Sequence, residues 1–414
     1  MKFIHTADLH LGQVMYQNYG REEEHRHFFM QLEQWCGEYR PDALLVSGDI
    51  FDIQQPGAAT RLAFNEYFVH FHNNYPQMQI VITAGNHDSA SRIQADAAVW
   101  GMGNVVMIGK PPASDCTSLP DGWQENYIVR MNGIGYVIAL PYMVGSRREV
   151  FQALLDYVEK ENRDGLPIVM MCHTAVTGMD YTGHDLDIGH LQTIDSSELG
   201  KGYDYLALGH MHRPQTLNQA PDGQEEVSLY PSGVMRYSGS ALHVSCDEKY
   251  PHSVSLVEIG HHGDEVKLTR LRINELLHFY ELPLGRSAQS CDEALSALKS
   301  FVEERQCGYI RFKIDYHVEL PSDFNQQVYE MIEHCVTDVR YNPKILWTNV
   351  PESEAVRKRP LFEVEDLQQM DDPIHFVEET IAHYSDLSLD EVRAAFEEIE
   401  AESRAIQEGK GTVK

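Results

Sequence analysis

The chain has 414 residues, of which 43% are hydrophobic and 23% charged, an ordinary globular composition long enough for two or three domains. Its formal net charge of −30 argues against a freely nucleic-acid-binding protein, but much of the acidity lies between residues 352 and 408. No apolar run approaches the roughly 18 residues of a membrane span, and the opening MKFIHTADLH lacks a signal-peptide core. Seven cysteines without CxxC spacing argue against a disulfide framework. We therefore expect a cytoplasmic protein with no membrane association.

Apolar runs of strand length dominate the first 265 residues. They are Met1–Thr6, Ala43–Ser47, Ile80–Ala84, Val105–Ile108, Tyr136–Leu140, Ile168–Cys172 and Tyr205–Leu208. Continuous runs of this kind are typical of strands buried on both faces between layers of helices. Helical patterns at Glu22–Tyr39 and Ala58–Phe71 alternate with them. The pattern predicts a layered α/β domain over residues 1–265, with its site beyond the carboxyl ends of the strands.

A second, smaller domain is predicted over residues 266–350. Leu277–Pro283 indicates a strand, and Ser290 with Glu293 forms a capping box that opens a helix. Tyr309–Val318 alternates apolar and polar residues, which predicts a half-exposed strand. A further helix is expected from Phe324 to Cys335 and a strand at Lys344–Thr348. These elements indicate a small α+β domain.

The C-terminal part divides into a charged linker, residues 351–372, and two amphipathic helices within residues 373–410. Two such helices cannot bury both apolar stripes against each other alone. We expect them either to dock back on the chain or to bind a partner.

Side chains suited to metal binding follow five of the apolar runs. They are Asp8 and His10, Asp49, Asn86 to Asp88, His173, and His210 and His212. Each fragment alone has a more ordinary reading, as a polar turn or a structural histidine. Their combination at one sheet edge predicts a metal centre.

Seven ligand candidates suit two ions about 4 Å apart that share a carboxylate. Mixed imidazole and oxygen donors favour Mn, Fe, Zn or Co over Mg or Ca. Glycines at positions 48, 85 and 209 permit sharp turns beside the ions. The pattern indicates metal-assisted hydrolysis of a phosphate ester.

The order D-x-H, G-D, G-N-H-D, H and G-H-x-H resembles the calcineurin-like metallophosphoesterases. The segments HTADLHLGQ, REEEH at 21–25, SGDIFD, AGNHDS, YLALGHMHR and YSGS further resemble the exonuclease SbcD family. The resemblance covers about the first 250 residues and implies an α/β/β/α catalytic domain. Residues 270–350 are similar to that family's capping domain, on the DNA-binding side, in position and element order.

The resemblance also implies a role for each candidate residue. One Mn²⁺ would be held by Asp8, His10, Asp49 and His212, and a second by Asp49, Asn86, His173 and His210. His87 is similar to the family's catalytic histidine, which acts on the scissile phosphate or the leaving oxygen, and Asp88 is expected to hold His87 by a hydrogen bond.

Several other residues carry weaker expectations. Asp52 stands where some archaeal relatives place a second catalytic histidine, and we expect it to serve only the turn. His5, His184 and His190 match no motif and are expected to be structural or surface residues. Arg92, Arg147 and Arg148 are candidate phosphate contacts, with plain surface solvation as the alternative.

The resemblance implies a Mn²⁺-dependent 3′–5′ double-strand exonuclease that also cuts single strands and hairpins, in DNA repair, replication and recombination. Its partner would be an SbcC-type coiled-coil ATPase that binds the C-terminal helices, in a heterotetramer containing a nuclease homodimer. ATP is expected to bind the partner, because the sequence contains no GxxxxGK[ST] loop. Two alternatives remain. One is a small-molecule metallophosphatase or cyclic-nucleotide phosphodiesterase, which would need neither the second domain nor the helical tail. The other is a non-catalytic scaffold, which would have no need of every ligand candidate and His87.

Overall fold

The computed structural model describes residues 1–113, 116–145, 147–180, 193–217, 219, 226–333 and 335–351. It contains two compact units, one formed by Met1–Ile314 with Val318–Leu346 and one by Asp315–His317 with Trp347 onward. The linker at 351–372, beyond its first residue, and the helices at 373–410 lie outside the described residues and stay predictions. None of the described helices is long and apolar enough to span a membrane.

The first sheet of unit 1 has seven strands and carries three of the predicted strand ends. In spatial order its strands are β14 (Val227–Tyr230), β17 (Val266–Arg272), β16 (Ser253–Ile259), β1 (Lys2–Thr6), β4 (Ala43–Ser47), β5 (Gln79–Thr83) and β6 (Val105–Ile108). Strands β1, β4, β5 and β6 run parallel, so their carboxyl ends share one edge. The sheet extends beyond residue 265, because β17 pairs with β16.

The second sheet has six strands and brings the other two predicted strand ends to the same region. Its order is β13 (Gln215–Thr216), β15 (Val234–Tyr237), β12 (Tyr205–Gly209), β9 (Ile168–His173), β8 (Gly135–Ala139) and β7 (Ile128–Met131). Strands β8, β9, β12 and β15 are parallel. The apolar runs identified in the sequence are therefore all strands in these two sheets.

The two sheets pack face to face, and helices cover their outer faces. Phe3, Leu45 and Val81 of the first sheet share a core with Val137 and Met171 of the second. The alternate positions of the first sheet, such as Ile4 and Leu44, pack under helices, which explains why these runs are apolar throughout. The predicted α/β/β/α layering is confirmed.

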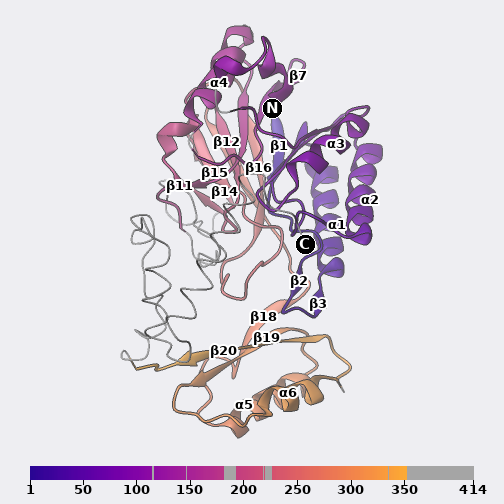
Figure 1. The fold of residues 1–414 in the computed structure, drawn as a ribbon, viewed down its shortest axis with the longest axis vertical. Helices are drawn as coiled ribbons and strands as arrows, with labels where there is room; N and C mark the ends of the chain where they lie inside the picture. The colour runs from indigo at the N-terminus through magenta and orange to yellow at the C-terminus, as the bar shows by residue number, and fades with distance from the viewer. Residues whose placement is uncertain are drawn as a thin grey trace, which may run out of the picture. The chain divides into compact units, whose positions relative to one another are not determined.

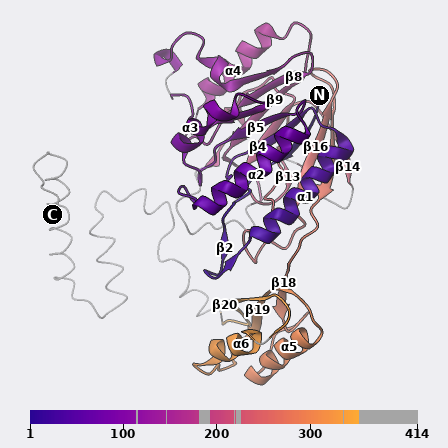
Figure 2. The ribbon, with the colours of Figure 1, turned by 90° about the vertical axis from the view of Figure 1, so that its right-hand side faces the viewer.

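Helices α1 (Glu22–Tyr39), α2 (Ala58–Asn74) and α3 (Ala90–Trp100) cover the first sheet, and α4 (Arg148–Glu161) covers the second (Figure 1). Figure 2 shows α1 and α2 side by side, where Phe29 stacks on Tyr67 with ring centroids 3.9 Å apart. Three glutamates fill the first turn of α1, where they complement the positive end of the helix dipole. A short hairpin, β2 (Val14–Met15) and β3 (Tyr19–Gly20), connects the end of β1 to α1, and a second short pair consists of β10 (Ala175–Val176) and β11 (Thr193–Ile194).

The cap, as we call the region from β18 to β20, has the predicted alternating order. It contains β18 (His278–Leu282), α5 (Cys291–Glu303), β19 (Gly308–Asp315), α6 (Phe324–Glu333) and β20 (Val339–Thr348), with β18 and β19 parallel. Ser290 Oγ accepts a hydrogen bond from Glu293 N at 3.1 Å, so it caps α5 as expected. Glu293, however, reaches back to Gln289 N and not to the Ser290 amide.

The expectation of a half-exposed strand at Tyr309–Val318 is wrong. Strand β19 is buried on nearly its whole length, including the charged Arg311, which is 7% exposed. Arg311 lies there because Glu281 and Asp247 each bind one end of its guanidinium group, at 2.6 and 2.8 Å. Charged residues in an alternating pattern thus do not guarantee a solvent-facing side.

Candidate metal centre

We call the strand ends that carry the ligand candidates Asp8, His10, Asp49, Asn86, His173, His210 and His212 the metal edge. The backbone there has an unusual conformation. Four ligand candidates have positive φ angles, Asp8 at 51°, His10 at 45°, Asp49 at 47° and His210 at 102°. Such conformations cost free energy in residues with a side chain and concentrate at functional sites.

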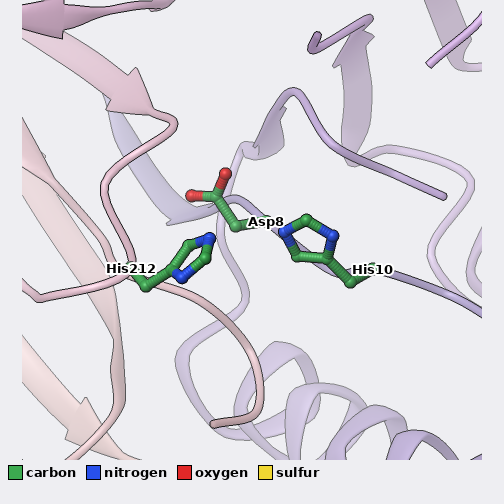
Figure 3. Close-up of side chains that lie close together, drawn as sticks. All are labelled: Asp8, His10 and His212. Atoms are coloured by element: carbon green, nitrogen blue, oxygen red, sulfur yellow. The ribbon is translucent and has the colours of Figure 1, made fainter. Parts of the chain in front are cut away.

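A first group consists of Asp8, His10 and His212, whose ligand atoms lie within 4.8 Å of one another (Figure 3). Asp8 and His10 follow β1, and His212 follows β12, so the two sheets meet here. Both ring nitrogens of His10 are buried without a well-formed hydrogen bond, although Asp52 lies 3.3 Å from Nδ1 and Asp49 lies 3.9 Å from Nε2. Because buried polar atoms normally have a close partner, the ring nitrogens fit the role of metal ligands.

A second group consists of Asp49, His173 and His210, also within 4.8 Å. His173 Nδ1 donates to the Ser47 carbonyl at 2.8 Å, so Nε2 is the ring nitrogen that a metal would bind once its proton is lost. Nε2 lies 2.9 Å from Asn86 Oδ1 and 3.4 Å from an Asp49 oxygen. His210 Nδ1 lies 2.9 Å from the same Asn86 oxygen. Convergent oxygen and nitrogen lone pairs fit a divalent cation among them.

Asp49 lies between the two groups. Its Oδ2 is 3.4 Å from His173 Nε2 and 3.9 Å from His10 Nε2, while Oδ1 accepts the His87 amide at 2.8 Å. Burial raises the pKa of the Asp49 carboxyl, but the surrounding histidines, His173 first, outweigh it and hold that pKa well below its usual range. The geometry is that of a carboxylate able to serve both groups.

The glycines beside the site act mainly through close approach. A Cβ on Gly85 would lie 2.1 Å from Asp49 Oδ1, and one on Gly209 would lie 1.8 Å from the Ser47 carbonyl oxygen. Only Gly48, at φ +85°, also needs the left-handed backbone region, so the predicted sharp turn applies to it alone among the three.

Comparison with known proteins places this site in a family. Residues 1–214 match the family described as calcineurin-like phosphoesterase. The SbcD component of the nuclease SbcCD from Rhodobacter capsulatus is 31% identical over 292 residues, 63% of this chain and 67% of that protein. The protein of the same description from Escherichia coli strain K12 is 27% identical over 276 residues, 62% and 65% of the two chains.

The chain belongs to the SbcD family of calcineurin-like phosphoesterases. As a member it is a metal-binding hydrolase that acts on phosphodiester bonds. The DNA double-strand break repair protein Mre11 of Methanocaldococcus jannaschii is also similar, at 27% identity over 242 residues, 58% of this chain and 56% of that protein. The matched regions span about two thirds of the length of the two bacterial relatives.

In this SbcD-family chain, Asp88 does not hold His87 as expected. Its two carboxylate oxygens accept the backbone amides of Gly85 at 2.8 Å and of Ile50 and Phe51, both at 3.0 Å. Burial and the charge of Asp49 raise the pKa of Asp88 to about 6 against these hydrogen bonds. Asp88 therefore fixes two loops of the metal edge relative to each other.

Asp52 does more than the turn role expected for it. Its backbone carbonyl lies 2.7 Å from His87 Nδ1, and its carboxylate lies 3.3 Å from His10 Nδ1. His10, Asp52 and His87 also form a third set of groups with ligand atoms within 4.8 Å. The expectation failed because Asp52 follows Asp49 in a loop whose course the sequence pattern does not specify.

One important residue was missed by sequence reasoning. Glu248 is 2% exposed, and its carboxylate lies 3.1 Å from His212 Nδ1 and 3.2 Å from His252 Nε2. A carboxylate on one ring nitrogen fixes a histidine's tautomer and orientation and leaves the other nitrogen for a metal. Glu248 stands in an irregular loop between β15 and β16, where no periodicity marks it.

The remaining candidates stay predictions. Arg92 in α3 and Arg148 at the start of α4 are exposed, while Arg147 is half-buried. His5 is fully buried beside Tyr205, with Nδ1 3.0 Å from the hydroxyl group, in agreement with its expected structural role. His184 and His190 lie outside the described residues.

Proposed function

We propose that this chain is a Mn²⁺-dependent DNA nuclease with two ions per chain. It would degrade double-stranded ends 3′–5′ and cut single strands and hairpins, as one component of an ATP-dependent complex in DNA repair, replication and recombination. The similar proteins, named as the SbcD component of SbcCD and as Mre11, support the substrate and the pathway. The site residues support the metal dependence.

The observation that carries the proposal is the pair of ligand groups with Asp49 between them, a member of the second group with Oδ2 3.9 Å from His10 of the first. Asp8, His10, Asp49 and His212 would hold one ion, and Asp49, Asn86, His173 and His210 the other. With two such ions bound, a water nucleophile would have a lowered pKa and the charge that develops on the phosphoryl group would be neutralised. This chain's residues supply the imidazole and oxygen donors that suit Mn²⁺.

His87 is positioned to handle the proton on the leaving 3′-oxygen. Its ring is exposed at the metal edge, and its backbone amide is bound to Asp49. The Asp52 carbonyl can only accept a hydrogen bond, so Nδ1 carries a proton and Nε2 is the atom that gains and loses one. A positioned acid of this kind contributes about 10²–10⁴-fold in rate. Asp88 would act indirectly, through the loop that carries His87.

The partner in this proposal is an SbcC-type coiled-coil ATPase. The name of the bacterial relatives, which describes them as one component of the SbcCD nuclease, supports such an assembly. The apolar stripes predicted within residues 373–410 would bind the coiled coil, and ATP would bind the partner. The assembly would contain two copies of this chain, and Arg92, Arg147 and Arg148 would contact DNA phosphates.

The test is cleavage of blunt duplex and hairpin DNA with Mn²⁺, with and without the ATPase. Bis(4-nitrophenyl) phosphate and a cyclic nucleotide serve as small comparison substrates. We expect Mn²⁺-dependent DNA cleavage that the ATPase and ATP stimulate on duplex ends. Efficient turnover of the cyclic nucleotide without cleavage of DNA would instead establish the small-molecule alternative, and no hydrolysis of any substrate would favour the scaffold.

A further inference from the structure

The REEEH segment at residues 21–25 has no part in the proposed chemistry. It opens helix α1, where three consecutive glutamates suit the helix dipole. Only Glu24 among them is buried, at 3% exposure, together with Arg21 at 2% and His25 at 3%. A dipole effect requires no burial, so the buried members of the motif have another role.

Glu24 and Arg21 form a buried ion pair with two hydrogen bonds. Arg21 Nη2 lies 2.6 Å from Glu24 Oε1, and Arg21 Nε lies 3.2 Å from Oε2. Paired hydrogen bonds between an arginine and a carboxylate fix the mutual orientation of the two groups as well as their distance. This pair is therefore a rigid junction.

On one side, the junction binds the cap. Tyr309 of β19 donates its hydroxyl hydrogen to Glu24 Oε2 at 2.7 Å. Arg340 of β20 donates from Nη1 to the same oxygen at 3.1 Å and to the Tyr309 hydroxyl at 2.7 Å. Two strands of the cap thus each contribute a side chain that binds the Glu24 carboxylate of the catalytic domain.

On the other side, the junction binds the loop that carries Asp8 and His10. Arg21 Nη1 donates to Gln13 Oε1 at 2.7 Å. His25 Nε2 lies 2.8 Å from the carbonyl oxygen of Leu9, the residue between Asp8 and His10. Burial and the charge of Arg21 lower the pKa of His25 to about 4, so its ring is neutral and donates to one of two carbonyl oxygens, that of Leu9 at 2.8 Å or that of Arg21 at 3.0 Å.

We propose that Glu24 is a positioning residue that sets the orientation of the cap relative to the metal edge. The inference rests on the proposed nuclease function and deepens it, because the residue would select for long DNA substrates. A duplex that contacts both the cap and the metal edge needs the two held in register, whereas a small phosphodiester needs the metal edge alone. Misplacement of a substrate by about 1 Å can cost about 10²-fold in rate.

Apolar contacts alone would hold the cap but would specify its orientation less well. Tyr309 stacks on Phe279 with centroids 4.6 Å apart, and Met15 and Leu277 pack in the same cluster. Such contacts are non-directional, while the hydrogen bonds on Glu24 are directional. The hydrogen bonds on Glu24 therefore fix the orientation of the cap, and the apolar cluster stabilises its contact with the catalytic domain.

Two tyrosines of the cap provide a matched test. Tyr309→Phe removes the hydroxyl group that binds Glu24 and keeps the stacked ring. Tyr341→Phe removes an equally short bond, 2.7 Å to Asn325, that lies wholly within the cap. With Mn²⁺ and the full chain, we expect Tyr309→Phe to lower duplex cleavage about tenfold and to keep bis(4-nitrophenyl) phosphate hydrolysis within about twofold. Tyr341→Phe should leave both rates within about twofold.

Equal losses on both substrates in Tyr309→Phe, no loss on duplex DNA, or the same loss in Tyr341→Phe would each overturn the proposal. A small ester turned over by a wild-type chain that does not cleave DNA would refute the nuclease function instead. A readout independent of activity separates the two failures.

That readout is amide hydrogen exchange in the Mn²⁺-loaded chain. Glu24→Gln should speed exchange in β19 and β20, whose Tyr309 and Arg340 side chains bind Glu24. It should also speed exchange in the loop from Asp8 to Gln13, because it loosens Arg21, which binds Gln13. Glu22→Gln, in the same helical turn but exposed, is the control and should change neither. Faster exchange in only one of the two regions would show that Glu24 does not couple them.

Discussion

Buried histidines of the ligand groups differ from the equally buried His5 and His25, which belong to neither group. At the edge, His10 and His173 are 3% and 0% exposed. Burial lowers the pKa of His173, but Asp49 and then Asp8 outweigh it and raise that pKa to about 9. Burial likewise opposes protonation of His10, yet nearby carboxylates, Asp52 first, raise its pKa.

His5 and His25 have the opposite surroundings. Burial and then Arg236 lower the pKa of His5 to about 3, and burial and then Arg21 lower that of His25 to about 4. These rings are neutral and tie strands and loops together, while the edge rings lie among carboxylates whose negative charge a cation would neutralise. Burial alone therefore does not identify a ligand; the sign of the neighbouring charge does.

The largest effect is expected from removing Asp49, the carboxylate that we propose both ligand groups share. Asp49→Ala should empty both sites, because the second group loses a ligand and the first loses the charge beside His10. Loss of several kcal/mol of charge stabilisation corresponds to at least about 10³-fold in cleavage rate. Metal analysis of the purified variant checks the first claim, and two retained ions would refute sharing.

His87 belongs to neither of these two classes of histidine and provides a second test. His87 is exposed and lies at the edge without membership of either predicted ligand set. His87→Ala should keep both ions and lose about 10²–10⁴-fold in DNA cleavage, because only a proton donor is removed. Metal content and cleavage are measured on the same preparation. A variant that lost metal would mark His87 as a ligand.

The third prediction concerns Glu248, whose carboxylate contacts His212 of the first ligand group. Glu248→Gln should weaken Mn²⁺ binding at the Asp8, His10 and His212 group by about 10–100-fold and leave the other site unchanged. Calorimetric titration resolves the two sites. Glu275→Gln is the control, because Glu275 lies 3.5 Å from His243, a histidine outside both ligand groups. Equal weakening in both variants would mean that Glu248 acts only through overall charge.

Sequence reasoning predicted the framework of this site because strand ends have a local signature. Apolar runs followed by Asp, Asn or His located β1, β4, β5, β9 and β12, and parallel strands necessarily bring such ends together. Helix α1 was predicted with its observed bounds, Glu22–Tyr39, from its helical pattern between two apolar runs. Fold and candidate ligands were thus accessible without a structure.

What the sequence did not reveal depends on contacts between distant loops. Glu248 lies 36 residues after His212 and carries no periodic mark. Asp88 was expected to contact its neighbour His87, yet its oxygens bind amides at positions 50 and 51. Arg311 is buried in an alternating strand because Glu281 from another strand pairs with it. Such partners follow from tertiary folding and have no local pattern.

The last prediction concerns His5 and the pH dependence of the free energy of unfolding. Its pKa is about 3 in the folded protein and about 6.5 when unfolded, so the unfolded state takes up the proton first as pH falls. The neutral ring therefore contributes stability that is complete above pH about 6.5 and is lost progressively toward pH 3.

His5→Asn keeps an acceptor near the Tyr205 hydroxyl but cannot titrate. Urea unfolding of the metal-free protein between pH 7 and pH 4 should then show a slope smaller by about 1.4 kcal/mol per pH unit at most. His261→Asn, at an exposed position, should keep the wild-type slope, and an unchanged slope in His5→Asn would show that His5 is not held neutral by its surroundings.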